Sequence, residues 1–257
     1  MNDAGWLLIT TAVSLVAGAI AGWGSAVLRQ REARKERLRE EVLRWANPIV
    51  NAVLGLKSRL RNILEDQLRL ALSPGSAAVN RPVDEDWAVS YDYVMPSTLF
   101  LFAEYFAWVQ LLRERVSLEL FESEQSQERF LRATWKVTGA LGAWPLKDNS
   151  NPEKAATGEA DAPLTGVDTQ VFALQQRAIG ELVIDRDHDP PRLLTYRQFL
   201  DELEQDARVA GLFEPLRVLV EDLEPGTKRW RRLESTVAAL ETLESECRAV
   251  LRVRGGR

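Results

Sequence analysis

The N-terminal segment constrains this chain most, because no charged side chain occurs from Ala4 to Leu28. As a helix, the 23 residues from Trp6 to Leu28 would be about 34 Å long, which exceeds the roughly 30 Å of hydrocarbon in a bilayer. Because lipid offers the backbone no hydrogen-bond partners, a single spanning segment must be helical. We therefore predict that residues 1–28 form one N-terminal transmembrane helix with the lipid bilayer as its partner.

A cleaved signal peptide is the main alternative for this segment. Small residues at Ala17, Ala19 and Ala21 have the form of a cleavage site. However, no basic side chain precedes Trp6, and the apolar run is longer than the roughly 7–15 residues of a signal peptide. We therefore favour an uncleaved anchor.

The two flanks of the anchor differ in charge, and this difference predicts its orientation. The N-terminal flank carries only Asp3, whereas basic residues follow the anchor at once. Basic flanks stay in the cytoplasm, so we expect the N-terminus outside and the large C-terminal part inside. The basic residues are Arg29, Arg31, Arg34, Lys35, Arg37 and Arg39.

Residues 29–46 contain no glycine or proline, which predicts that a charged juxtamembrane helix continues the anchor into water. This helix could pair as a coiled coil, contact anionic headgroups or remain a solvated flank. Within the anchor, small residues recur at every fourth position and form one stripe. Such a stripe lets two helices approach closely, which favours a homo-oligomer, although a segment rich in alanine and glycine also produces it by chance. The stripe consists of Ser14, Gly18, Gly22 and Ala26.

The composition excludes several kinds of site. Cys247 is the single cysteine and His188 the single histidine, so neither an intrachain disulfide nor a thiol zinc site can form. The net charge of −5 argues against nucleic acid as a partner, although basic residues surround Trp230. Three aspartates flank His188 without the spacing of a calcium loop, and we interpret them as a solvated turn. We therefore predict no metal, no cofactor and no catalytic residue set.

Residues 47–257 show the 3.6-residue apolar period of helices almost throughout, with Ala88–Val94 as the only candidate strand. We predict an all-α fold, in which the transmembrane helix is followed by a cytosolic bundle of about six or seven helices with a flexible loop near 146–167. The expected helices cover residues 47 to about 73, 98–120 after Pro96-Ser97, 123–141, 169–184 after an Asp168 cap, 196–210 after a Thr195/Gln198 capping box, 213–223 and 227–252.

One group of polar residues on apolar helices is the candidate site. Gly180 interrupts a helical pattern, which indicates close approach of a neighbouring helix or a ligand. We weigh a polar pocket, in which Arg177 holds an anion or a partner's carboxylate, against a tight helix crossing with structural ion pairs. Arg59 could reach Glu104 or Glu181 in either case. The candidate residues are Arg59, Asn62, Glu104, Gln176, Arg177 and Glu181.

Three segments, WANPIVNAVLGLKSRLRNIL, AEYFAWVQLLRE and QQRAIGEL, carry a resemblance over residues 45 to about 199. Their combination resembles uncharacterised bacterial single-pass membrane proteins with a helical cytosolic domain. The resemblance implies a bacterial inner-membrane location and brings no activity with it.

These features lead to one functional prediction and two alternatives. We predict a membrane-anchored, non-enzymatic helical module that interacts with an unknown protein partner and self-associates. The first alternative is an effector that oligomerises and perturbs the membrane. The second is an enzyme that uses a polar pocket around Arg177, Glu181 and Glu104.

Overall fold

The computed structural model describes residues 47–65, 68–74, 79–80, 88–115, 123–143 and 168–255, and in addition residues 30, 32, 33, 36, 40, 44, 121, 165 and 166. The chain divides into two units, Met1–Arg44 and Trp45–Arg257. The predicted anchor with its small-residue stripe lies outside the described residues, as does most of the predicted loop near 146–167. Within the described ranges, no helix is long and apolar enough to cross a bilayer.

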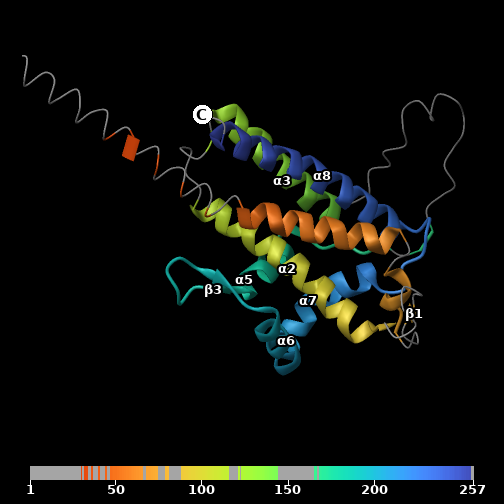
Figure 1. Cartoon of the computed structure of the whole chain (residues 1–257). Helices are drawn as coiled ribbons and strands as arrows, with labels where there is room; N and C mark the ends of the chain where they lie inside the picture. Colours follow the sequence, from red (N-terminus) through yellow and green to blue (C-terminus); the bar gives the residue numbers. More distant parts are fainter. Residues whose placement is uncertain are drawn as a thin grey trace, which may run out of the picture. The chain divides into compact units, whose positions relative to one another are not determined.

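The second unit is mostly helical, which confirms the predicted all-α class (Figure 1). Two short antiparallel strand pairs, β1–β2 and β3–β4, interrupt the helices. The elements are a helix over residues 47–64, the 3-10 helix η1 (Arg69–Leu72), β1 (Val79–Asn80), β2 (Ala88–Val89), α2 (Tyr91–Arg115), α3 (Glu124–Gly142), α5 (Ala173–Leu182), β3 (Ile184–Asp185), β4 (Arg192–Leu193), α6 (Tyr196–Gln205), α7 (Ala207–Val220) and α8 (Lys228–Gly255).

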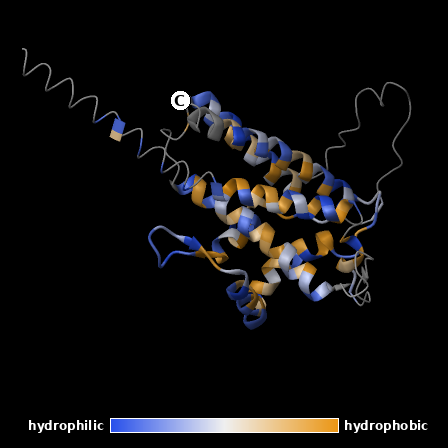
Figure 2. Ribbon diagram, in the orientation of Figure 1, coloured by the Kyte–Doolittle hydropathy of each residue, from blue (hydrophilic) through white to orange (hydrophobic). Residues whose placement is uncertain are grey.

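Helix α2 is central to this unit and contacts η1, α5, α6 and α7. Its residues are apolar on most sides, and Leu99, Phe102 and Phe106 are buried. A helix that is apolar all round must be enclosed by other elements to remove that surface from water. Helix α3 packs along α8. Figure 2 shows hydrophobic residues along the helix over 47–64 and along α2, whereas α6 is largely hydrophilic.

Helix α2 begins earlier than the sequence predicted. Pro96-Ser97 was expected to open it, but Pro96 lies inside the helix, which starts at Tyr91. The Ser90 carbonyl accepts the N–H groups of Tyr93 and Val94, at 3.1 and 3.0 Å. The Ser97 and Thr98 hydroxyls donate to the Val94 carbonyl at 3.1 and 2.7 Å. These side-chain hydrogen bonds lie next to Pro96, which has no N–H and therefore cannot donate a hydrogen bond to the preceding turn of the helix.

Other predicted helix boundaries were also wrong. The first helix ends at residue 64 and not near 73, since the chain turns into η1 and buries Ala71 and Leu72. The predicted helix over 196–210 is divided at Asp206, whose carboxylate accepts the Arg208 N–H at 2.7 Å and starts α7. Helix α7 then continues to Val220 in place of the predicted helix over 213–223.

The predicted capping box at the start of α6 is confirmed. The Thr195 hydroxyl accepts the Gln198 N–H at 3.4 Å, and the Gln198 side chain accepts the Thr195 N–H at 2.9 Å. Thr195→Ala should therefore lower the free energy of unfolding by about 1 kcal/mol, measured by urea denaturation of the full chain. The control is Thr242→Ala, because Thr242 lies inside α8 and alanine is the better helix former there. Equal loss of stability in both variants would contradict the capping role.

Candidate functional site

A cavity of about 210 Å³ lies between α2, α3 and α5. Six of its lining residues come from α2, one from α3 and three from the start of α5. Their mixture of apolar walls and a few polar groups is typical of ligand pockets, although the volume is below the roughly 300–1,000 Å³ of drug-sized sites. The lining residues are Tyr105, Phe106, Val109, Gln110, Arg113, Glu114, Thr138, Ala173, Gln176 and Arg177.

Close packing of α5 on α2 forms one side of this site. A Cβ atom on Gly180 would lie 2.9 Å from the Phe106 carbonyl carbon and 3.0 Å from the Ala107 nitrogen. Backbone atoms cannot move aside as a flexible side chain would, so only glycine allows this approach. The predicted close helix contact at Gly180 is confirmed.

The side chain of Gln176 joins α5 to α3 beside the cavity. Only 4% of this residue is exposed, and its amide nitrogen donates to the Val171 carbonyl at 2.7 Å and the Thr138 carbonyl at 3.1 Å. A second contact reinforces this junction, because a Cβ on Gly142 would lie 2.8 Å from the Val171 oxygen. The amide nitrogen of Gln176 therefore links α5 to the backbone of α3 and of the segment before α5.

An ion cluster lies beside the cavity, and Arg186 is its centre. The Arg186 guanidinium donates twice to Glu114, both at 3.0 Å, and once to Glu181 at 2.9 Å. The amide nitrogen of Gln110 donates to Glu114 at 3.1 Å and also to Glu181. These carboxylates raise the pKa of Arg186, chiefly through hydrogen bonds, with Glu114 first.

The partner of Glu181 is a residue that the sequence analysis did not consider. The spacing of Arg177 and Glu181 would allow an ion pair within α5, but Glu181 pairs with Arg186 instead. Arg186 follows strand β3, and its planar guanidinium binds both Glu114 and Glu181. Arg177 is exposed at the cavity and has no ion-pair partner among the described residues.

Two buried polar atoms among the residues lining the cavity lack a partner in the described part of the chain. They are the Tyr105 hydroxyl, on a residue only 1% exposed, and the Gln110 Oε1 atom, on a residue 7% exposed. Burial raises the pKa of Tyr105, so this hydroxyl keeps its proton and can donate a hydrogen bond. Leaving such a group unpaired costs about 1–3 kcal/mol, and neither atom is accessible from the open part of the cavity.

Four of the predicted site residues do not line the cavity: Arg59, Asn62, Glu104 and Glu181. Arg59 is half-buried, and its Nη1 atom has no hydrogen-bond partner among the described residues. Burial lowers the pKa of Arg59, and the electrostatic interaction with Tyr93 and a hydrogen bond to it oppose that change. Burial raises the pKa of Glu104, and this carboxylate forms no ion pair with Arg59 in the described structure. Asn62 accepts the Leu68 N–H through its backbone carbonyl at 3.0 Å.

The cavity contains polar residues that the sequence analysis did not select. Tyr105, Gln110 and Arg113 interrupt the apolar pattern of α2 and line the same cavity. The recurrence of polar groups along one buried helix was a signal that could have identified them. The structure thus brings Gln176 and Arg177 together with residues of α2 and not with Arg59.

Three of the basic residues around Trp230, namely Arg229, Arg231 and Arg232, have side-chain partners within the fold. Arg232 is fully buried and binds Asp168 through two hydrogen bonds, at 3.0 and 2.6 Å. Asp168 was predicted to cap the next helix, but α5 starts at Ala173 with Phe172 as its cap residue. The carboxylate is drawn to the buried guanidinium because an unpaired charge there would be costly.

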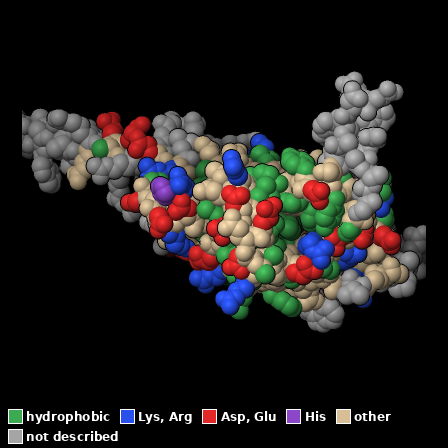
Figure 3. All heavy atoms as spheres, turned by 90° about the horizontal axis from the view of Figure 1, so that it is seen from below, with side chains coloured by type: hydrophobic (Ala, Val, Ile, Leu, Met, Phe, Trp, Pro, Cys, Tyr) green, Lys and Arg blue, Asp and Glu red, His purple; other side chains and the backbone are tan. Residues whose placement is uncertain are grey.

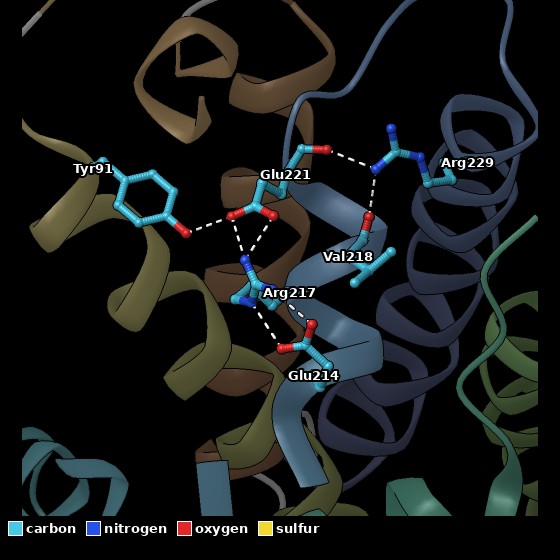
Figure 4. A network of polar contacts seen from close by, with 6 residues as sticks. All are labelled: Tyr91, Glu214, Arg217, Val218, Glu221 and Arg229. Atoms are coloured by element: carbon cyan, nitrogen blue, oxygen red, sulfur yellow. Dashed lines mark hydrogen bonds and ion pairs between the residues drawn. The ribbon is translucent and has the colours of Figure 1, made fainter. Parts of the chain in front are cut away.

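Arg229 binds the C-terminal end of α7 (Figure 4). Its guanidinium donates to the carbonyl of Glu221 at 2.6 Å and to that of Val218, which have no further helical partners. Nearby, Arg217 joins Glu214 and Glu221, and the Tyr91 hydroxyl donates to Glu221 at 2.6 Å. These contacts connect the starts of α2 and α8 to α7.

The acidic turn around His188 is also internally paired. The Asp185 carboxylate accepts from Arg192 at 3.0 Å and lies 3.1 Å from the His188 Nδ1 atom. The Arg192 hydrogen bond is the main reason that the pKa of Asp185 is lowered. Figure 3 shows the histidine among acidic and basic side chains, and no group of potential metal ligands occurs in the described residues.

Comparisons with protein-family models, with curated proteins and with solved structures found no match to this chain. Its function is therefore inferred from its sequence and from the chemistry of the cavity.

Proposed function

We propose that this chain is a membrane-anchored, non-enzymatic helical interaction module of the bacterial inner membrane, with its helical domain in the cytoplasm. The observation that carries the proposal is the uncharged run from Ala4 to Leu28 beside the basic flank that starts at Arg29. The run is long enough to span the hydrocarbon, and the flank resists translocation.

The described domain offers a surface for a partner protein. Trp135, Phe172 and Leu174 are 65%, 56% and 80% exposed. Trp135 lies in α3, Phe172 directly precedes α5 and Leu174 lies in its first turn. Large exposed apolar side chains favour protein contacts.

The charges beside the cavity support binding more than catalysis. Arg186 holds both Glu114 and Glu181, so neither carboxylate is placed as a free acid or base. Glu104, the third member of the predicted enzymatic set, does not line the cavity. A catalytic carboxylate must reach the reacting atoms, so geometry favours the binding function.

The membrane anchor is tested by fractionation of lysed bacterial cells. The full chain should sediment with membranes, and protease added to intact cells should leave a C-terminal tag uncut. Ile20→Arg should move part of the protein to the supernatant, because an arginine at mid-membrane costs about 2.5–3.5 kcal/mol. Ile20→Leu is the control. Full-length protein in the supernatant would refute the anchor.

Self-association is tested by crosslinking in the same membranes. Gly18→Leu plus Gly22→Leu should reduce the dimer yield, because leucine prevents close approach of two helices. Ala12→Leu plus Gly24→Leu is the matched control, since these positions face away from the stripe in a helix. Equal yields in both double variants would contradict association through Ser14, Gly18, Gly22 and Ala26.

A further inference from the structure

We infer that the protein partner of this domain inserts an apolar side chain of an acidic amphipathic helix into the cavity between α2, α3 and α5. This inference rests on the proposed function, in which the domain binds another protein, and it specifies the chemistry of that protein. Two observations carry it: exposed apolar side chains surround the mouth of the cavity, and two exposed arginines of the cavity wall have no ion-pair partner among the described residues.

Exposed apolar side chains gather around this cavity. Three of the five large apolar residues that are exposed in the described part of the chain are Trp135, Phe172 and Leu174. Trp135 lies one turn before Thr138 in α3, and Thr138 lines the cavity. Phe172 and Leu174 directly precede and follow Ala173, which also lines it. Apolar surface gathered around one opening is typical of a protein contact.

The packing of the start of α5 on α3 places these side chains within reach of one partner helix. The Phe172 α-carbon lies 3.3 Å from the position of a Cβ atom on Gly142. Gly142 follows Trp135 by seven residues in α3, which places both on one side of that helix about 10 Å apart. A helix with its side chains is about 10–12 Å wide, so a single partner helix can contact both Trp135 and Phe172.

The cavity itself is a socket for an apolar side chain. It opens to solvent, has a volume of about 210 Å³, and takes apolar walls from Phe106, Val109 and Ala173. The strongest contacts of protein interfaces are made by such anchors, which are aromatic or aliphatic side chains that fill a pocket on the partner. A flat bilayer surface would leave this concave space unfilled, so shape complementarity favours a protein.

The charge around the opening determines the charge of the partner. Arg113 and Arg177 are exposed, line the cavity and form no ion pair within the described residues. The nearby carboxylates of Glu114 and Glu181 are both bound by Arg186. The charge left for a partner is therefore positive. Carboxylates around the apolar anchor of the partner complement it and would also accelerate association.

Fluorescence anisotropy with two labelled peptides tests this inference. Both peptides are amphipathic helices with leucines and one central tryptophan on the apolar face, and the opposite face carries glutamates in one and lysines in the other. The full chain in phosphatidylcholine nanodiscs should bind the glutamate peptide about tenfold more tightly than the lysine peptide, with empty nanodiscs as the blank. Equal binding of the two peptides, or no saturable binding of either, would refute the inference.

Two pairs of variants separate the apolar contribution from the charged one. Leu174→Asp should weaken binding of the glutamate peptide about tenfold, whereas Leu70→Asp should not, because Leu70 is an exposed leucine of η1 outside the cavity wall. Arg177→Glu should weaken binding of the glutamate peptide and strengthen binding of the lysine peptide, a reversal that a folding defect does not produce. Arg197→Glu, at an exposed arginine of α6, should change neither. Unchanged binding in both Leu174→Asp and Arg177→Glu would refute this docking site.

Other occupants of the surface would give different results. Loss of peptide binding in nanodiscs that contain phosphatidylglycerol would show that the surface lies on anionic lipid. Loss of the crosslinked dimer in Leu174→Asp would show that a second copy of the chain occupies it. Either result would overturn the inference. Failure of the membrane anchor is seen separately, because the chain would then elute apart from the nanodiscs, and titration of that free chain would still test the cavity.

Discussion

Replacing Arg232 by methionine is expected to lower the free energy of unfolding by about 3–5 kcal/mol, the usual result of breaking a buried ion pair. Arg232 is fully buried and the Asp168 side chain is only 3% exposed. The substitution leaves the Asp168 carboxylate in a region without solvent to stabilise it. It also leaves the carbonyls of Ala140 and Ala143, which accept from Arg232 at 2.8 and 3.1 Å, without their donor.

The measurement is urea denaturation of the full chain, with Arg132→Met as the matched control. Arg132 pairs with Glu128 on the surface of α3, where both side chains are about two-thirds exposed. Such a pair contributes about 0.3–0.5 kcal/mol, so its loss should be small. Asp168→Leu combined with Arg232→Met should recover part of the stability, because no unpaired charge remains. Equal effects of Arg232→Met and Arg132→Met would refute the structural role of the buried pair.

Gly180→Ala should be the second large effect, a loss of about 1–3 kcal/mol from overpacking. Alanine is ordinarily the better residue inside a helix by about 1 kcal/mol, so intrinsic helix propensity predicts the opposite sign. The sign reverses here because the added Cβ would lie 2.9 Å from backbone carbon of Phe106. Helices α2 and α5 would have to separate, which would also alter the cavity between them.

Gly211→Ala and Gly139→Ala are controls for this effect. No described residue has an atom within 4 Å of a Cβ built at Gly211 in α7 or at Gly139 in α3, apart from the glycine's own helix backbone and its chain neighbours. Both substitutions should leave stability unchanged or raise it by up to about 1 kcal/mol. Thermal unfolding of the full chain measures all three variants, and a stabilised Gly180→Ala would show that the α2–α5 contact is looser than the structure indicates.

Local sequence signals predicted those features that depend on neighbours in the chain. The 3.6-residue period predicted the helices, and the Thr195/Gln198 spacing predicted a capping box that the structure confirms. The sequence predicted close packing at Gly180 without identifying the partner, because glycine inside a helix is less favourable than alanine and close packing offsets that loss of stability. The sequence did not reveal that the partner is the backbone at Phe106.

Side-chain partners distant in the sequence were not predictable in the same way. Glu181 could pair with Arg177 four residues earlier, yet Arg186 binds it together with Glu114 of α2. Asp168 had the position of a helix cap, yet it binds Arg232, which is 64 residues away. In both cases the ion pair forms between residues that the fold brings together. The Arg232–Asp168 pair is buried, and Arg186 binds Glu114 through two of its nitrogens.

By itself, the sequence determined the helical class and the capping box at the start of α6, and it predicted an anchor, because periodicity, turn chemistry and hydrophobicity act over a few residues. Only the tertiary structure decided where most of the other helices begin and end, which ion pairs form and where the cavity lies. These depend on the packing of α2 against its neighbours, and the free energy of a buried charge or an added methyl group is set by atoms that no local pattern contains.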